Sequence, residues 1–428
     1  MSWTFVLRPS ETETFDSCRR AWDLGARVRR DLVPLLPAPL DFDTALRTAL
    51  AVYYFPAMDD WNRSIVRPLA VEGFRRALRE DRAAHEAVAA FDEALTATWD
   101  RAWRLGHLLL HRYFAFAAAF DDFDSVLADD DLWVPVPHPD RSGAELGTPD
   151  GRPIRYLCRL DQLIADPDDE WWVVDHRLSW GSWTDDRELL QAQRTVRILW
   201  ALETAYPQIH VAGTVHNELR ITDAEAADPP AVRADDLDIA ADAELDRRDM
   251  TTGARRANLR RSPMTPEERI LGAAVDRPDE IAHREELDGV RRTWVRRGHG
   301  EMHLVGQELG RQARAMTDAK VAVPASPAPD ICRRCPFLAP CLVMESGGDA
   351  EPMLAARYRR RLPEEFDESG LRTSTQRVRA RAHLGGAALH STGARDPAGD
   401  RGLTDTDPPV VRRDQRVDED AQTEGRER

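Results

Sequence analysis

Two apolar runs joined by a polar gap are the feature that most limits how this chain can fold. The segment PIRYLCRLDQLIADPDDEWWVVDHRLSW carries these runs at residues 154–165 and 171–178, separated by DPDDE at 166–170. Apolar runs on either side of a turn sequence predict a β-hairpin. A helix is expected at about 186–205 and a further strand at about 210–219. Strand, strand, helix and strand predict an α/β core with a mixed sheet.

Long helices are expected ahead of this core. Helix-like patterns at about 42–55, 66–91 and 93–120 predict a large helical N-terminal portion whose apolar residues form core. Nearer the start, Ser10 and Glu13 in PSETETF match the S-x-x-E capping box, which predicts the start of the first helix.

The second half of the chain is expected to be less regular. The stretch at about 222–249 is rich in Ala and Asp and predicts an insertion or loop, with helices at about 266–274 and 278–319. The composition of residues 363–428, with few apolar side chains, predicts a disordered tail. One enlarged domain is expected over residues 1–362. Its parts would be a helical part at about 40–125, a core at about 150–220 and a helical, cysteine-bearing part at about 263–345.

The charge balance limits how such a chain can meet nucleic acid. The formal net charge is −16, which counts against coating of nucleic acid by overall charge, because neutralising phosphates needs Lys and Arg. A local groove remains compatible with that charge. No apolar stretch approaches the roughly 18 residues that span a bilayer, and no basic start leads into a long apolar core. We therefore expect no membrane partner and a cytoplasmic location.

Asp161 lies on the first predicted hairpin strand, and Asp175 and Arg177 lie on the second. Side chains alternate along a strand, so Asp175 and Arg177 point to the same face. If Asp161 faces Asp175, the two carboxylates form an oxygen site suited to Mg²⁺ or Mn²⁺, and such a metal activates water at a phosphate. The alternative is a pair of surface or turn acids with Arg177 as their ion-pair partner. Asp175 follows the apolar run WWVV, where a charge needs a partner or a metal.

Cysteine spacing indicates a second site. CRRCPFLAPC places Cys332, Cys335 and Cys341 in a C-x₂-C-x₅-C arrangement, of which the first pair has metal-ligand spacing. Three thiolates are an incomplete tetrahedral set, and Cys18 is the candidate for the fourth ligand. Cys158 lies on the hairpin, on the face opposite Asp161, and is predicted to be a buried core thiol. An iron–sulfur cluster, zinc and unligated thiols all remain open, because spacing does not separate the two metals.

Two arginine clusters and several tryptophans allow both a binding and a packing interpretation. The arginines lie in ARRANLRRS and VRRTWVRRG, at Arg255, Arg256, Arg260, Arg261, Arg291, Arg292, Arg296 and Arg297. They could line a phosphate groove with Trp294 stacked on a base, but we favour a solvated helix face with Trp294 in the core. Trp180 and Trp183 could flank a substrate channel, and we favour packing under the following helix. The chain has no G-x-x-x-x-G-K-[ST] loop, so a helicase of that type would have to be a partner.

The string RLDQLIADPDDEWWVVDHR resembles the central motif of the PD-(D/E)xK nucleases, in particular their RecB-like branch. Asp161 matches the first acid of that motif, Asp175 matches the second, and Arg177 stands in the place of the expected Lys. The resemblance implies a restriction-endonuclease-like sheet with flanking helices. It also implies that Asp161 and Asp175 bind Mg²⁺ or Mn²⁺.

Three further positions follow from the same resemblance. Gln191, or else Gln193, matches the Gln that this branch carries on the following helix, and Thr195 then stands where a Tyr is frequent. Many relatives carry a His in an early helix, where this chain offers Arg47. Arg stays protonated and is a poor general base, so the Arg177 and Arg47 departures raise the prospect of a site that does not cut.

One distant N-terminal Cys with a C-terminal triplet resembles the iron–sulfur staple of RecB-like nucleases such as the AddB family and the CRISPR adaptation nucleases. The opening SETETFDSCRRAWDLGARVRR resembles their first helical segment, and the resemblance covers roughly residues 5–345. It implies a structural 4Fe–4S cluster, with zinc as the alternative, that ties the two ends of the domain together. Its ligands would be Cys18, Cys332, Cys335 and Cys341.

Taken together, these resemblances predict a metal-dependent DNA nuclease in repair, recombination or defence. Asp161, Asp175, Arg177 and Gln191 would carry the chemistry, and DNA and a helicase or other protein would be the partners. The alternative is a cluster-bearing DNA-binding or scaffold subunit that has lost cleavage. A third reading is a zinc-stapled protein with no role on nucleic acid.

Overall fold

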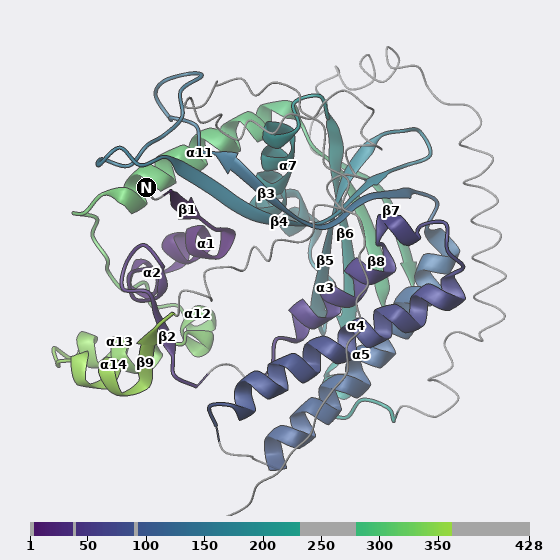
Figure 1. Ribbon diagram of the computed structural model, residues 1–428, viewed down its shortest axis with the longest axis horizontal. Helices are drawn as coiled ribbons and strands as arrows, with labels where there is room; N and C mark the ends of the chain where they lie inside the picture. Colours follow the sequence, from purple (N-terminus) through teal and green to yellow (C-terminus); the bar gives the residue numbers. More distant parts are fainter. Residues whose placement is uncertain (1–3, 37–39, 90–92, 232–279, 362–428) are drawn as a thin grey trace, which may run out of the picture. The chain divides into compact units, whose positions relative to one another are not determined.

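The computed structural model describes residues 4–36, 40–89, 93–231 and 280–361, all within one unit, Met1–Leu389 (Figure 1). The helix expected at about 266–274, the tail expected over 363–428 and the first arginine cluster lie outside the described residues. So does most of the 222–249 stretch, whose first residues form the short helix α8 (Asp223–Ala227). None of the described helices combines the length and the apolar character needed to cross a membrane.

A seven-stranded mixed sheet forms the centre of the described chain. Its strands are β1 (Phe5–Leu7), β3 (Asp124–Pro135), β4 (Ile154–Ala165), β5 (Trp171–Trp180), β6 (Val211–Ile221), β7 (Glu280–Leu287) and β8 (Val290–Arg296). Their order is β1-β4-β5-β6-β8-β7, and β3 also pairs with β4. The β1–β4 and β5–β6 pairs are parallel and the others antiparallel. The predicted α/β core with a mixed sheet is confirmed.

The β4–β5 hairpin lies where the sequence predicts it. Its turn is shaped by Asp166, whose Oδ1 accepts hydrogen bonds from the backbone N–H groups of Asp168 (2.9 Å) and Glu170 (2.8 Å). Asp169 takes a left-handed conformation with φ 63°. Asp tolerates this conformation and bonds to backbone nearby, so the polar gap makes a defined turn.

Helices cover both faces of the sheet (Figure 1). On one face α3 (Phe42–Tyr53), α4 (Arg63–Glu86) and α5 (Glu93–Phe120) share a buried apolar cluster with β5, β6 and β8. On the other face α7 (Gln193–Ala205) and α11 (His299–Thr317) share a second cluster with β1, β3 and β4. The predicted N-terminal helices are therefore confirmed. The structure also shows that they form one complete layer of the fold.

Two local predictions are wrong. The helix expected over 278–319 is a hairpin in its first half, because Asp288 (φ 44°) and Gly289 (φ 76°) make a two-residue turn between β7 and β8. Only its second half, α11, is helical.

The capping box predicted for the first helix is also wrong. Helix α1 (Pro9–Ser17) already includes Ser10, and its N-cap is Arg8, which makes no side-chain capping bond. Proline suits the first helical position, so Pro9 sets the start.

The two ends of the described chain meet in a small module. There β2 (Leu32–Pro34) pairs antiparallel with β9 (Tyr358–Arg360). Around this pair lie α2 (Arg19–Gly25), α12 (Pro329–Arg334), α13 (Leu338–Glu345) and α14 (Glu351–Arg357). Ion pairs also cross between the ends, from Arg30 to Glu351 (2.7 Å) and from Arg361 to Asp31 (2.6 Å).

Candidate functional site

Asp161 and Asp175 lie where β4 and β5 part. The two strands pair from Ala165 opposite Trp171 to Gln162 opposite Val174, and the acids are the next residues on each strand. The backbone N–H of His176 donates to Asp161 Oδ2 (3.0 Å) across the opening. We call this place, with Asp161 and Asp175 at its mouth, the strand fork. A splayed pair of strands leaves backbone and side chains free to meet something other than each other.

Two guanidinium groups hold the acids of the strand fork. Arg47, from α3, places Nη1 2.6 Å from Asp161 Oδ2 and 4.0 Å from Asp175 Oδ1. Its Nε donates to Asp43 Oδ2 (2.8 Å), one helical turn earlier. Arg177 donates hydrogen bonds to Asp175 Oδ2 from both Nε (2.9 Å) and Nη2. The structure therefore brings Asp161, Asp175 and Arg177 together as predicted, and adds Arg47 between the acids.

The electrostatics differ between the two acids. Burial alone would raise the pKa of Asp175, but Arg177, His216 and Arg47 together hold that pKa well below its usual range. Burial raises the pKa of Asp161, and the nearby charge of Arg47 offsets this only in part. Asp175 is thus the firmly ionised member of the pair, because its carboxylate has the larger set of cationic and hydrogen-bonding partners.

Strand β6 supplies the neighbours of Asp175 and Arg177. His216 is fully buried, with Nδ1 3.5 Å from Asp175 Oδ2, and burial lowers its pKa. Glu218 lies opposite Arg177 in the strand register, but its carboxylate is already engaged by Arg291 Nε (2.9 Å) and Ser179 Oγ (2.8 Å). Glu218 therefore serves the sheet's internal ion pairing. It is not an obvious third acid for the strand fork.

The other face of the strand fork is a buried polar network. His176 stacks on Tyr54 at 6.1 Å between ring centroids, and its Nδ1 lies 3.3 Å from Asn217 Nδ2. Burial lowers the pKa of His176 to about 3, so its ring is neutral at physiological pH. Because His176 also donates its backbone N–H to Asp161, this network sets the position of the acids.

The pH dependence of stability should report on His176. Its folded pKa is about 3, below the ordinary 6.5, so the unfolded chain binds more protons and stability falls as pH drops from 6.5 towards 3. Lowering the pH from 7 to 5 should remove about 2 kcal/mol through this residue. We expect His176→Asn to be less stable at pH 7 but to lose less on acidification, as measured by urea unfolding at both pH values. An unchanged pH slope in the variant would contradict the assignment.

The structure does not join the predicted glutamine to the acids. Gln191 is exposed at the break between α6 (Asp186–Leu190) and α7, and no hydrogen bond in the described part of the chain links its side chain to Asp161 or Asp175. The alternative, Gln193, is also exposed, whereas Thr195 is buried and donates to its own helix at Ala192 O (2.8 Å).

Arg194, on the first turn of α7, is a residue that sequence reasoning missed. It is exposed, and its charge lowers the pKa of Asp161 against the effect of burial. The flanking Gln191 and Gln193 drew attention in the sequence because the expected motif has a Gln there. Arg194 therefore adds a weak cationic influence on Asp161, after that of Arg47.

The strand fork as it stands does not fit a divalent metal ion. Within residues 4–36, 40–89, 93–231 and 280–361, no three Asp, Glu, His or Cys side chains gather as a set that could hold one. The space between the acids faces Arg47 Nη1, and Asp175 Oδ2 is taken by Arg177. Two carboxylates with two guanidiniums are already balanced in charge, so a cation gains little by entering.

The predicted cysteine ligands come from both ends of the described chain, and their binding of a metal stays a prediction. Cys18, at the junction of α1 and α2, shares a small apolar cluster with Cys335, Phe337 and Tyr358. Burial raises the pKa of Cys335, and the charges of the thiols of Cys18, Cys341 and Cys332 raise it further. All of these thiols are free.

The four cysteines supply the donor chemistry of a thiolate-bound metal, but no three of them gather within the described residues as a set that could hold one. Four thiolates that repel one another are stabilised by a soft cation or a cluster. Arg20 Nη1 lies 3.8 Å from Cys341 Sγ. The fifth cysteine, Cys158, is buried in the sheet core, as predicted.

The second arginine cluster proves to be structural. It lies on β8, which pairs with β6 and β7, and just after that strand, not on a helix. Arg291 pairs with Glu218, Arg292 with Asp121 (2.8 Å) and Arg296 with Glu170 (2.7 Å). Trp294 is buried, as favoured.

The two tryptophans after β5 do not behave alike. Trp180 is 60% exposed, so the expectation that it packs under the following helix is wrong. Trp183 is half-buried, with the guanidiniums of Arg220 and Arg291 at 4.7 Å and 4.9 Å from its ring centroid. Gly181, which follows β5, has φ 74°, and its N–H still donates to Ile221 O of β6 (2.8 Å).

Comparison with family models and with curated proteins finds no match. At the strand fork, two arginines, Arg47 and Arg177, form ion pairs with two carboxylates. Neither guanidinium can serve as a general base, because arginine keeps its proton.

Proposed function

We propose that this chain is a nucleic-acid-binding protein of the RecB-like PD-(D/E)xK type that holds DNA at the strand fork without hydrolysing it. The observation that carries the proposal is the position of Arg47 Nη1, which lies within ion-pair distance of both acids. Support for the fold type comes from the mixed sheet, with two acids at the parting of a central hairpin and helices on both faces.

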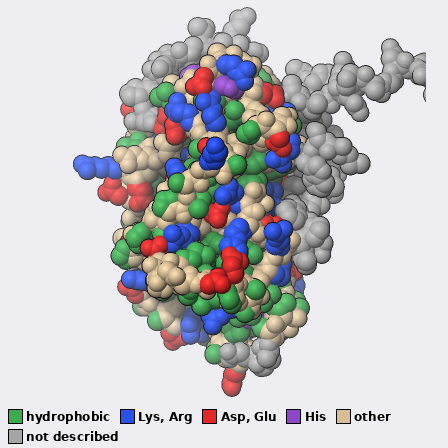
Figure 2. Space-filling view, turned by 90° about the vertical axis from the view of Figure 1, so that its left-hand side faces the viewer, with side chains coloured by type: hydrophobic (Ala, Val, Ile, Leu, Met, Phe, Trp, Pro, Cys, Tyr) green, Lys and Arg blue, Asp and Glu red, His purple; other side chains and the backbone are tan. Residues whose placement is uncertain are grey.

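The charges at the strand fork favour a phosphodiester. Arg47, Arg177 and Arg194 supply three guanidinium groups that act on the acids there, and Asp43 shares the guanidinium of Arg47. Planar guanidinium groups suit phosphate oxygens, which they can bind through two parallel hydrogen bonds. Figure 2 shows basic and acidic side chains interspersed on the face it draws, with no broad surface of one sign there. A local arginine site is therefore a better basis for binding in a chain of net charge −16 than overall attraction.

The cysteine site is proposed to hold a 4Fe–4S cluster, with zinc as the alternative. Cys18, Cys332, Cys335 and Cys341 would be the ligands, and the bound group would supply a structural link between the ends of the chain. The ion pairs between the same two ends support this role. The pairing of β2 with β9 needs both ends in place.

A second candidate is the metal-dependent DNA nuclease. The observation that favours it is that Asp161 and Asp175 adjoin the last paired residues of β4 and β5, where both carboxylates reach one arginine atom. In that case Arg47 would have to leave the acids before a metal could bind. The two candidates differ in one measurable result, digestion of DNA.

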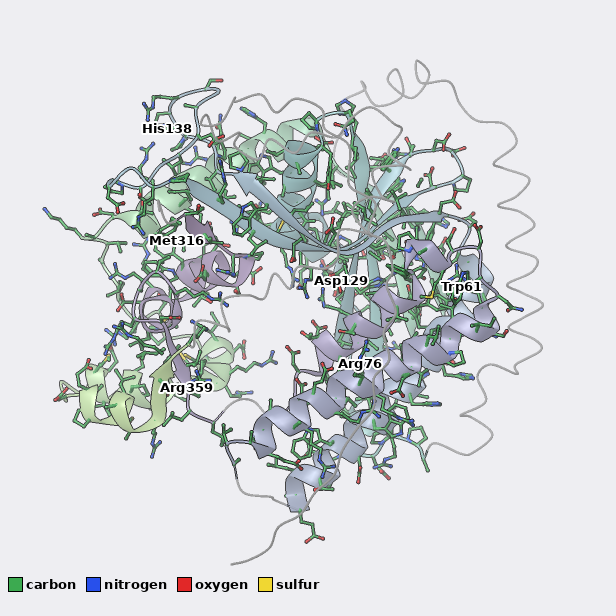
Figure 3. The ribbon with its side chains drawn as sticks, in the orientation of Figure 1. Trp61, Arg76, Asp129, His138, Met316 and Arg359 are labelled. Carbon is green, nitrogen blue, oxygen red and sulfur yellow. The ribbon has the colours of Figure 1, made fainter. Side chains whose placement is uncertain are left out.

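The test measures binding and digestion with the full chain. We expect labelled DNA to be retained with an affinity that falls as salt rises. Arg194→Ala should lower the slope of log affinity against log salt by about 1. Arg76→Ala is the matched control, because Arg76 is an exposed arginine on α4 (Figure 3) and should leave the slope unchanged.

In the digestion arm, wild type and Asp175→Ala are incubated with DNA and Mg²⁺ or Mn²⁺. We expect no more degradation by wild type than by the variant. Digestion by wild type but not by Asp175→Ala would contradict the proposal and support the second candidate, the metal-dependent nuclease. A chain that neither retains nor degrades DNA would remove both candidates.

A further inference from the structure

We propose that the guanidinium of Arg47 is a built-in cation that stands in for a divalent metal between Asp161 and Asp175. The inference deepens the proposed function and rests on it for taking the strand fork as the centre of the site. It makes a separate physical claim: the acids can bind a metal ion only when Arg47 is removed.

The position of Arg47 follows from α3. Asp41 caps this helix by accepting from Thr44 N (3.1 Å), and its buried side, which includes Ala45 and Leu46, packs into the core. Arg47 then extends from the helix towards the strand fork with its side chain 20% exposed. The bond from its Nε to Asp43 restrains the side chain, so the guanidinium is held in place before any ligand arrives.

One atom of Arg47 brings positive charge to the place between the two carboxylates where a metal ion would bring it. Nη1 lies 2.6 Å from an oxygen of Asp161 and 4.0 Å from an oxygen of Asp175. A hard divalent cation near that point could take one oxygen from each carboxylate and complete its shell with water. The guanidinium supplies positive charge there without needing free metal, and it cannot activate water.

Arg177 does not play the same part. It binds a single acid, Asp175, and does so at Oδ2, whereas Arg47 approaches Asp175 at Oδ1. Glu218 also lies beside Arg177 and favours its charge. Removal of Arg177 would therefore leave Arg47 in place between the acids. Arg177→Ala is the matched control for a lost guanidinium at the same site.

The test measures Mn²⁺ binding and thermal unfolding of the full chain. We expect wild type and Arg177→Ala to show no saturable Mn²⁺ binding at the acids. Arg47→Ala should unfold at a lower temperature in chelator, because two buried carboxylates then face each other. Saturating Mn²⁺ should raise its midpoint by several degrees. It should also bind one Mn²⁺ at least tenfold more tightly than wild type does, as followed by electron paramagnetic resonance.

Two further variants make the test decisive. Adding Asp161→Asn to Arg47→Ala should abolish the gained site, which separates it from any binding at the cysteines. Arg47→Gln, which is neutral but can still hydrogen-bond, replaces Arg47→Ala if the alanine variant fails to fold. The inference is overturned if folded Arg47 variants gain no Mn²⁺ binding. It is also overturned if wild type binds Mn²⁺ through Asp161 as tightly as they do. DNA retention by wild type is measured separately, so either result leaves the proposed function to its own test.

Discussion

Replacing Cys335 by alanine is expected to release both ends of the described chain together. Cys335 lies in the same small cluster as Cys18 and feels the charges of the other three thiols of the proposed ligand set. If those sulfurs hold a metal or cluster, loss of one ligand removes a link between segments more than three hundred positions apart. The β2–β9 pair then depends on its small apolar cluster and on a few ion pairs between the ends, of which the exposed ones contribute little.

The expected effect is large. Structural zinc in zinc-finger peptides contributes about 10–16 kcal/mol at neutral pH, and even a fraction of that would dominate a small module. We expect Cys335→Ala to lose bound iron or zinc, to unfold at a lower temperature and to become sensitive to protease near α12 and α13. Metal analysis, a visible spectrum and limited proteolysis of anaerobically purified protein measure these effects.

Cys158→Ala is the control for this experiment. Cys158 is also a free thiol, 2% exposed, but it lies in the sheet core away from the other four. Its replacement should leave the metal content unchanged and cost only the modest free energy of a small cavity. A wild-type chain without metal would contradict the proposed site, as would equal metal loss in both variants.

The central hairpin could be predicted because its signals are local. Apolar runs give the strands, and the DPDDE gap between them gives the turn, so β4 has the predicted bounds and β5 extends two residues further. The helical layer was predictable for the same reason, since apolar periodicity within each segment is enough to identify a helix.

The second hairpin was missed because its strands bury charge. Arg291 and Arg292 on β8 suggest a solvated surface, yet they pair with Glu218 and Asp121, both more than seventy positions away. Sequence spacing cannot show such long-range partners. The signal that was available is Asp288–Gly289, a dipeptide typical of tight hairpins.

The residues of the site could be predicted from the sequence, but the cation that lies between the two acids could not. The acids and cysteines follow from motif spacing, whereas the chemistry depends on which cation lies between the acids. Arg47 lies 114 positions before Asp161, and only the packing of α3 against the sheet brings them together. The same reason explains why Gln191 drew attention while Arg194 did not.

Arg292→Met is expected to be among the most destabilising single changes in the described chain. Arg292 is fully buried, with Nη2 2.8 Å from Asp121 Oδ1 and Nε 2.7 Å from Asn217 Oδ1. Its guanidinium also lies over the rings of Phe116 and Phe123. Methionine has a similar length and keeps the apolar contacts, but it leaves Asp121 charged and buried. Breaking a buried pair in this way costs about 3–5 kcal/mol, measured by urea unfolding.

A double variant distinguishes two effects of Arg292→Met: the loss of the contacts of Arg292, and the burial of the Asp121 carboxylate without its ion-pair partner Arg292. Asp121→Asn with Arg292→Met should recover a large part of the loss, because the amide carries no charge and can still accept the bond from Tyr54. Arg296→Met is the matched control. Arg296 lies on the same strand as Arg292, and its 2.7 Å ion pair with Glu170 is partly exposed. That change should cost no more than about 1 kcal/mol. If the double variant is no more stable than Arg292→Met alone, the loss of the ion pair at Asp121 is not the cause, and the lost contacts to Asn217 and the two rings must carry the effect.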